Sequence, residues 1–166
     1  MPSEAEWERA AKGTTDDTCG PWRRFPWGDD CPPEFLLPNW DAKYLAECSA
    51  VTWTQETSRA NCVEGDCIDG FLKTSPVGQF PAGNSSFGVT DMIGNLSQWV
   101  QDTYHERWIG APNNGAAWED GGRGRVRKGA SFYEAGRMAR SASRVYDLPV
   151  STYDFVGFRC ANDPSK

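Results

Sequence analysis

The sequence contains no long hydrophobic run. Only 39% of its 166 residues are hydrophobic, and the mean hydropathy is -0.63. No segment approaches the roughly 18 consecutive apolar residues of a transmembrane helix, and the first residues do not have the pattern of a secretory signal peptide. We therefore expect no membrane span. We also expect the eight Trp, eight Phe and five Tyr to supply much of the buried area.

Histidine is nearly absent, since His105 is the only one in the chain. Zinc sites of the usual kind need several histidines or closely spaced cysteine pairs, and the sequence has no CxxC pair. Nucleophilic catalysis by a serine is also unsupported, because no histidine accompanies Ser131 or Ser141 and no Gly-x-Ser-x-Gly motif is present. We interpret His105 as a surface residue.

A net positive charge is lacking as well. The net charge is -6 and the isoelectric point is about 4.8, which argues against nucleic acid as a partner. The basic residues are nevertheless concentrated near the C-terminus, where Glu134 is the only acidic residue among Arg123, Arg125, Arg127, Lys128, Arg137, Arg140 and Arg144. This pattern allows two interpretations: a cationic surface, or arginines that are solvated or paired internally with carboxylates.

Cysteine, by contrast, is plentiful. Five of the six cysteines lie in the first half of the chain, and Cys160 stands alone near the end. Without metal-binding spacing, this content favours disulfides formed in an oxidising compartment, and so an extracellular or periplasmic protein. Cys62–Cys67 is the easiest local bridge, and the sequence leaves the rest of the pairing open.

The local patterns predict an irregular α+β protein. Ser3 and Glu6 form a capping box for a short helix over residues 3–12, and Gly13 is a typical C-terminal stop. Turn residues and aromatics alternate over residues 14–67, which predicts ordered but irregular structure. Residues 76–80 are expected to be extended and residues 107–124 to form a surface loop. Strands are predicted at 96–100, at 125–132 with a kink at Gly129, and at 156–160.

Residues 86–102 combine aromatic side chains, a glycine-centred turn and a row of oxygen-bearing residues. The last group is Asp91, Gly94, Leu96 and Gln98. A turn that opens into a strand can direct two side-chain oxygens and two backbone carbonyls at one point, as a hard cation such as calcium requires. The alternative is a simple tight turn over residues 92–95, with Asp91 and Asn95 serving only as turn residues.

Short motifs of one known family follow one another along almost the whole chain. They are Pro2-Ser3-Glu4-Ala5-Glu6-Trp7-Glu8, Pro26-Trp27-Gly28, Asn39, Asp69-Gly70-Phe71, Pro76-Val77-Gly78, Phe87-Gly88, Asp91-Met92-Ile93-Gly94-Asn95, Trp99, Arg125-Val126, Lys128-Gly129, Ser131-Phe132, Arg140-Ser141-Ala142, Arg144 and Gly157-Phe158-Arg159. The ordered set resembles the formylglycine-generating enzyme family, also called the sulfatase-modifying factor domain. The resemblance implies a single domain over residues 1–166 with an irregular, loop-rich variant of the C-type lectin-like fold, with few short strands and short helices.

In this family the helix that opens the present chain lies well inside the domain. The resemblance therefore implies that the chain corresponds to the C-terminal part of the usual domain. It would then be truncated, cleaved, a reduced natural version, or completed by a partner chain that supplies the missing N-terminal strands. In some members the cysteine that matches Cys160 bridges to that missing part, so Cys160 is expected to lack its usual partner.

The resemblance also implies two structural calcium sites. The first would use the side chains of Asn39 and Asp69 with the carbonyls of Trp40 and Phe71. The second would use the side chains of Asp91 and Gln98 with the carbonyls of Gly94 and Leu96. Position 98 is usually Glu in the family, so Gln98 is a departure. One carboxylate per site predicts modest affinity.

The catalytic groups of the family are missing. Oxygen-using members bind copper(I) through two cysteines in the segment that follows the Lys-Gly-Gly-Ser-like motif, and residues 131–140 contain no cysteine. Iron-dependent relatives need a set of histidines, which His105 alone cannot provide. Met138 is interpreted as a core residue. We therefore expect no copper site.

The sequence thus favours a non-catalytic module that binds a peptide, protein or glycan ligand. Aromatic residues beside arginines suit such ligands, and the resemblance places them in the family's substrate groove, at Trp108, Trp118, Tyr133, Arg137, Arg140 and Tyr146. One alternative is a formylglycine-generating type of oxidoreductase that acts on a protein cysteine with an external cofactor or partner subunit. The other is a structural fragment that another chain completes.

Overall fold

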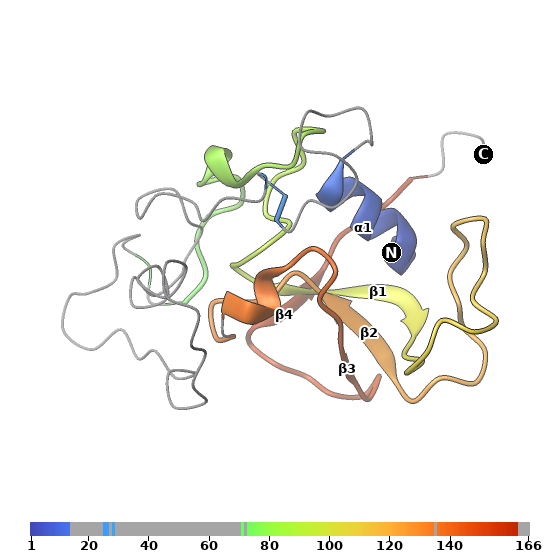
Figure 1. Cartoon of the computed structure of the whole chain (residues 1–166). Coiled ribbons are helices and arrows are strands. Elements are labelled where there is room, and N and C mark those ends of the chain that lie inside the picture. Colours follow the sequence, from blue (N-terminus) through green and yellow to red (C-terminus); the bar gives the residue numbers. More distant parts are fainter. Residues whose placement is uncertain (14–24, 27, 29–70, 72, 135, 163–166) are drawn as a thin grey trace.

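Figure 1 shows the computed structural model of the chain, which describes residues 1–13, 25, 26, 28, 71, 73–134 and 136–162. These residues contain the helix α1 (Glu4–Lys12), two short 3-10 helices (Pro81–Gly83 and Gly136–Ala139) and the strands β1 (Ser97–Thr103), β2 (Arg125–Lys128), β3 (Val145–Asp147) and β4 (Val156–Phe158). The predictions for residues 14–67 lie outside the described part, apart from Phe25, Pro26 and Gly28. None of the described helices has the length and apolar character to span a bilayer.

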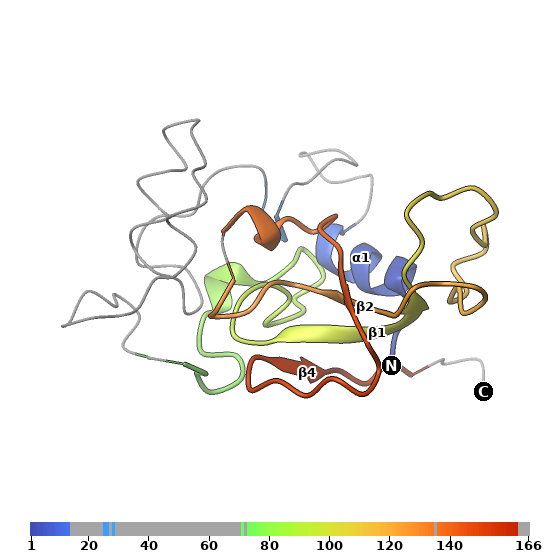
Figure 2. The ribbon, with the colours of Figure 1, turned by 90° about the horizontal axis from the view of Figure 1, so that it is seen from below.

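The four strands form one mixed sheet in the order β3-β2-β1-β4. β2 pairs antiparallel with both β1 and β3, whereas β4 lies parallel to β1 at the edge. Seen from below, β4 runs along the side of β1 away from β2 (Figure 2). The register of β1 against β2 shifts between Trp99 and Thr103, so the ladder is interrupted there.

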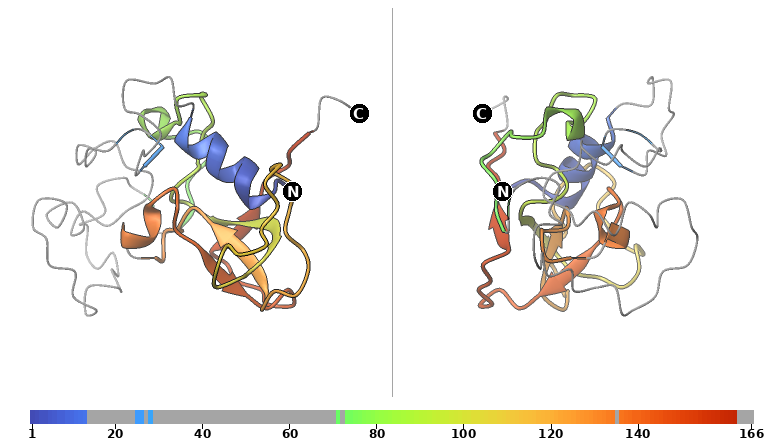
Figure 3. Two further views of the ribbon diagram at one scale, coloured as in Figure 1. Left: turned by 45° about the vertical axis from the view of Figure 1, so that its right-hand side comes forward. Right: turned by 90° about the vertical axis from the view of Figure 1, so that its left-hand side faces the viewer.

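Helix α1 packs across one face of β1 and β2 (Figure 3). The predicted capping box is confirmed: the Ser3 hydroxyl accepts a hydrogen bond from the Glu6 N–H (3.1 Å), and the Glu6 carboxylate accepts one from the Ser3 N–H (2.8 Å). Gly13 ends the helix with a φ of 83°, as predicted. The helix buries Trp7 and Ala11 in a core with Met92, Ile93, Val100 and Val126.

Gly129 explains how the loop before β1 fits beneath the helix. Its φ is +95°, and a Cβ atom there would lie 2.6 Å from the Met92 carbonyl oxygen and 3.1 Å from the Trp7 ring. Its own carbonyl accepts a hydrogen bond from the Gly94 N–H (2.9 Å). The kink predicted at Gly129 is therefore the point at which β2 ends. Only glycine can bring its Cα so close to the Met92 carbonyl and the Trp7 ring.

The carboxylate of Glu4 is buried beneath α1 and is neutralised by two cations. Arg144 donates two hydrogen bonds to it, from Nε to Oε1 (2.7 Å) and from Nη2 to Oε2 (2.8 Å). The Lys128 Nζ lies 3.4 Å from Glu4 Oε1 and 3.1 Å from Glu8 Oε2. Because the side chains of Glu4 and Lys128 are 2% and 0% exposed, these pairs are shielded from water.

Four of the basic residues near the C-terminus form ion pairs with carboxylates of the same chain. Arg127 pairs with Glu134 and Asp147, while Lys128 and Arg144 pair with Glu4, and Arg125 contacts Glu119 at 3.5 Å. The interpretation as internally paired cations is therefore confirmed for these residues. A continuous cationic surface formed by them is not present.

The strand predictions are confirmed at 97–100, at 125–128 and at 156–158, but residues 76–80 form turns instead of extended structure. Pro76 accepts a hydrogen bond from the Gln79 N–H (3.2 Å), which closes a turn there. In β4 the alternate apolar positions are not directed into the core, since the side chain of Phe158 is 69% exposed to solvent. The opposite side carries Gly157, which packs against Leu96, and Arg159.

We predict that Glu4→Gln lowers the free energy of unfolding by about 3–5 kcal/mol, because it removes the buried counter-charge of Arg144 and leaves Lys128 with Glu8 alone. Urea denaturation monitored by tryptophan fluorescence measures this change. Glu119→Gln is the matched control: it breaks an ion pair in which Glu119 is 52% exposed, and we expect a loss of less than about 1 kcal/mol. Equal losses in the two variants would contradict a structural role for the buried pair.

Candidate functional site

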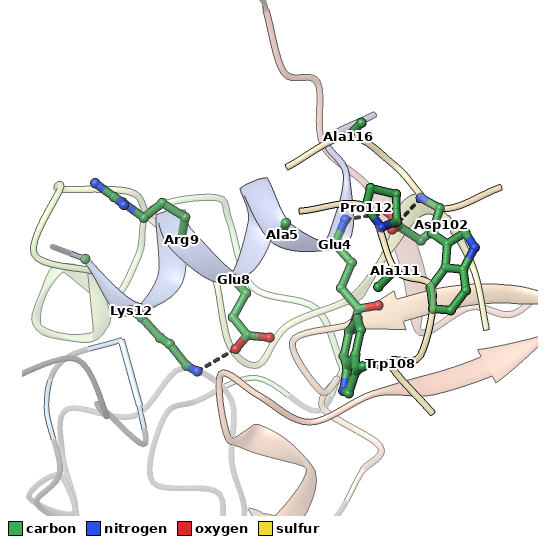
Figure 4. Close-up of a pocket in the computed structure, with 12 residues that line it drawn as sticks. Glu4, Ala5, Glu8, Arg9, Lys12, Asp102, Trp108, Ala111, Pro112 and Ala116 are labelled. Carbon is green, nitrogen blue, oxygen red and sulfur yellow. Dashed lines mark hydrogen bonds and ion pairs between the residues drawn. The ribbon is translucent and has the colours of Figure 1, made fainter. Parts of the chain in front are cut away.

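A pocket of about 390 Å³ lies between α1 and the loop that joins β1 to β2 (Figure 4). It is lined by Glu4, Ala5, Glu8, Arg9, Lys12 and Gly13 from the helix side, by Asp102 from β1, and by Trp108, Ala111, Pro112, Ala116 and Trp118 from the loop. The loop side is therefore apolar and aromatic, whereas the helix side is mostly charged. Such a combination is typical of ligand sites.

Asp102 holds the two walls of this pocket together. Its side chain is buried, and its Oδ2 accepts a hydrogen bond from the Glu4 N–H at the first turn of α1 (2.5 Å). Its Oδ1 accepts one from the Trp118 N–H in the loop (2.9 Å). A carboxylate at a helix N-terminus is favoured by the helix dipole. The sequence reasoning missed this residue, although Asp102 shares the buried alternate positions of β1 with Gln98 and Val100.

Both tryptophan rings of the pocket rest on side chains that are themselves anchored. The Trp118 ring stacks on His105 with a centroid distance of 3.5 Å, and the His105 Nδ1 lies 3.1 Å from the Thr103 carbonyl oxygen. The Trp108 ring lies 4.0 Å from the guanidinium carbon of Arg144, which Glu4 holds in place. Trp108 remains 57% exposed. The rings are thus oriented before any ligand arrives, which reduces the entropic cost of binding.

The structure does not bring the six residues of the predicted groove together. Trp108 and Trp118 line the pocket, and Tyr146 is connected to it through a stack on Tyr104, whose ring also faces Arg144. Tyr133 stacks instead on Phe155. Arg140 is exposed. Arg137 lies in the 3-10 helix Gly136–Ala139, and the structure does not describe its side chain. Ligand binding by these residues stays a prediction.

Tyr133 stacks on Phe155 beside Arg127, a β2 residue that faces away from α1 because side chains alternate along a strand. Val126 and Lys128 of β2 face α1, whereas Arg127 faces away and lies over the Phe155 ring at 5.6 Å. Arg127 donates to Asp147 (2.7 Å) and Glu134 (2.5 Å). Burial alone lowers the pKa of Arg127, but Asp147 and Glu134 outweigh it and raise that pKa above its ordinary value.

Glu134 occupies the segment in which the resemblance implies the copper-binding cysteines. Its carboxylate accepts hydrogen bonds from the Ser131 N–H (3.0 Å) and from the hydroxyls of Ser131 (3.2 Å) and Ser97. With Arg127 as its counter-ion, the carboxylate is fully committed to structural contacts. Met138 of the same segment packs against the core, as predicted. Among the residues of this segment that the structure describes, the Glu134 carboxylate is therefore not free to act as an acid or base.

The structure describes all four residues of only the second of the two predicted calcium sites. Three ligands of the first, Asn39, Trp40 and Asp69, lie outside the described residues, so that site stays a prediction. At the second, the Gln98 Oε1 accepts hydrogen bonds from Trp7 (2.8 Å) and Arg159 (2.6 Å). Its oxygen is thus already used, and the four residues as arranged do not fit a calcium ion. No group of three or more His, Cys, Asp or Glu with metal-binding geometry occurs in the described part.

The free thiol of Cys160 lies just after β4. It is exposed, and it forms no disulfide with any other residue that the structure describes. The remaining five cysteines lie outside the described ranges, so the disulfide prediction, including Cys62–Cys67, is untested.

A capped helix over a small mixed sheet, with long irregular loops and buried ion pairs, defines a loop-rich α+β domain. The chain belongs to the FGE-sulfatase family: residues 1–164 match the sulfatase-modifying factor enzyme 1-like domain. This result confirms the predicted family and fold class.

Individual relatives agree with this assignment. The chain is 32% identical to the formylglycine-generating enzyme of Mycobacterium tuberculosis, covering 99% of this chain and 51% of that protein. It is 30% identical to the mouse inactive C-alpha-formylglycine-generating enzyme 2, covering 100% of this chain and 44% of that protein. The structure of PvdO from Pseudomonas aeruginosa matches with a TM-score of 0.59 and 30% identity over 95% of this chain and 50% of that one. The chain therefore spans about half the length of these relatives.

We predict that the Glu8 carboxylate in the pocket makes stability depend on pH. Burial alone raises the pKa of Glu8, but Lys128 and Lys12 outweigh burial and hold that pKa below its ordinary value of 4.5. A lowered pKa in the folded state stabilises the fold above pH 4.5, and this contribution is lost as the pH falls through the folded pKa. Glu8→Gln should therefore be less stable than the wild type at pH 7.

The difference in unfolding free energy between the wild type and Glu8→Gln should shrink as the pH falls below 4.5. Urea denaturation of both proteins over a series of pH values measures it. A difference that stays constant from pH 7 into the acid range would contradict the ion pairs of Glu8 with Lys128 and Lys12.

Proposed function

We propose that this chain is a non-catalytic, ligand-binding module on the formylglycine-generating enzyme scaffold. The observation that carries the proposal is the chemistry of residues 131–140. They contain no cysteine, and their one carboxylate, Glu134, is an ion-pair partner of Arg127. Because copper(I) prefers thiolate ligands, this segment lacks what the oxidation of a substrate cysteine would need.

The pocket beside α1 is the ligand site in this proposal. Two oriented tryptophan rings can stack on an aromatic side chain or a sugar ring. Arg9 at the rim supplies an additional donor for a carboxylate. The ligand is therefore a peptide or glycan segment of another molecule, with an aromatic or sugar ring placed on Trp108 and an acidic group towards Arg9.

The name of one relative supports a non-catalytic role. The mouse protein at 30% identity is called inactive, so members of the family need not keep the oxidation chemistry. Structural calcium at Asn39 and Asp69, disulfides in the first half and an extracellular or periplasmic location complete the proposal. The oxidoreductase alternative would need a copper site from a partner subunit, and the structural-fragment alternative would need a partner chain in the native assembly.

We predict that the chain, incubated with copper(I), oxygen and a peptide carrying a sulfatase-type cysteine, forms no formylglycine. Mass spectrometry of the peptide measures the product, and metal analysis of the dialysed protein measures bound copper. The formylglycine-generating enzyme of Mycobacterium tuberculosis is the positive control. Oxidised peptide or a stoichiometric copper ion would favour the oxidoreductase. A stable monomer in size-exclusion chromatography with mass measurement would contradict the structural-fragment alternative.

We further predict that Trp108→Ala weakens binding of peptides or glycans selected on an array by roughly 10-fold or more, because aromatic anchors carry much of the binding energy. Ile109→Ala is the matched control: Ile109 is the next residue, is 81% exposed and does not line the pocket. Titration calorimetry with each selected ligand gives the dissociation constants. Equal affinities of wild type and Trp108→Ala would place the ligand site elsewhere.

A further inference from the structure

The side-chain amide of Gln98 is held in one orientation. Its Oε1 accepts hydrogen bonds from the Trp7 Nε1 (2.8 Å) and the Arg159 Nε (2.6 Å), and its Nε2 donates to the Asp91 carbonyl oxygen (2.6 Å). Indole and guanidinium groups can only donate. Rotating the amide by half a turn would place its NH₂ against two donors and its oxygen against a carbonyl, so three hydrogen bonds would be lost together.

In this orientation the NH₂ group of Gln98, and not its oxygen, faces the loop before β1. The side of Gln98 that points at the Asp91 carbonyl is an N–H donor, and a calcium ion accepts only oxygen ligands. Only the Asp91 carboxylate and the carbonyls of Gly94 and Leu96 would remain. The Asp91 Oδ2 already accepts a hydrogen bond from the Gly78 N–H (2.7 Å). These three residues supply one ligand fewer than the four-residue site that the resemblance implies, for an ion that takes six or more oxygens including those of water.

A guanidinium supplies positive charge at the same place. The Arg159 Nη2 donates to the carbonyl oxygens of Thr90 and Asp91, both at 3.0 Å, while its Nε donates to Gln98. Arg159 also lines a cavity with Asp91, Leu96 and Gln98. One fixed cation thus binds several oxygens of a loop whose residues Asp91 and Asn95 both have positive φ angles.

We infer that the Gln98 amide, held in one orientation by Trp7 and Arg159, removes the second calcium site that the family implies, so that residues 90–98 fold without metal. A glutamate at position 98 would change this. One of its oxygens would still accept from Trp7 and Arg159, and the other would face the Asp91 carbonyl. That pair of oxygens needs a cation between them, so a single substitution should create a calcium site.

The experiment compares the wild type, Gln98→Glu and Asp91→Asn. Asn tolerates the φ of 51° at position 91 and keeps an oxygen for the Gly78 N–H, so this variant removes only the charge. Equilibrium dialysis against calcium, followed by metal analysis, counts the ions bound per chain. Gln101→Glu, three residues along β1, controls for the added charge. Circular dichroism confirms that each protein is folded.

We expect the wild type and Asp91→Asn to bind equal numbers of calcium ions, including any held at the first predicted site. Gln98→Glu should bind one more than both and melt at a higher temperature with calcium than with chelator, because an ion that binds only the folded state stabilises it. Gln101→Glu should behave as the wild type. Loss of one ion on Asp91→Asn, or no gain on Gln98→Glu, would overturn the inference. Neither result bears on the ligand pocket, which is tested separately through Trp108.

Discussion

The buried carboxylate of Glu4 is the contact on which the rest of the structure depends. It lies in the first turn of α1 and pairs with Arg144 and Lys128, which are more than one hundred residues away in sequence. A buried charge without partners would be expelled into water, so the helix, β2 and the segment before β3 must assemble together. The same Arg144 then supports the Trp108 ring. The contact that holds the fold together therefore also shapes the pocket.

The sheet separates two kinds of chemistry. The face under α1 carries the apolar core, the Glu4 pairs and the pocket, whereas the other face carries Arg127 with Glu134 and Asp147. Arg127 and Lys128 are neighbours in sequence, yet their ion pairs lie on opposite sides because strand side chains alternate. Arg127, Lys128 and Arg144 of the basic run near the C-terminus are thus explained by two separate sets of carboxylates, one on each face of the sheet.

Local patterns predicted the local structure well. The capping box, the stop at Gly13, the cores of three strands and the end of β2 all follow from neighbouring residues. The sequence did not predict long-range pairs such as Asp102 with Trp118, because nothing local distinguishes a buried carboxylate from a solvated one. For the same reason the sequence could not show that Trp108 and Trp118 line one pocket while Tyr133 stacks on Phe155. β3 was not predicted, because residues 133–153 show no clear alternation of apolar and polar side chains.

Gln98 illustrates how a single atom type decides between two ways of stabilising the same loop. An amide and a carboxylate have nearly the same shape, and both can accept from Trp7 and Arg159. They differ at the second polar atom, which donates in one and accepts in the other. Whether the loop requires an external cation therefore depends on this position and on its two donors, not on the spacing of Asp91, Gly94 and Leu96. Spacing shows where an ion could lie, whereas the hydrogen-bond partners of the ligands show whether their oxygens are available to it.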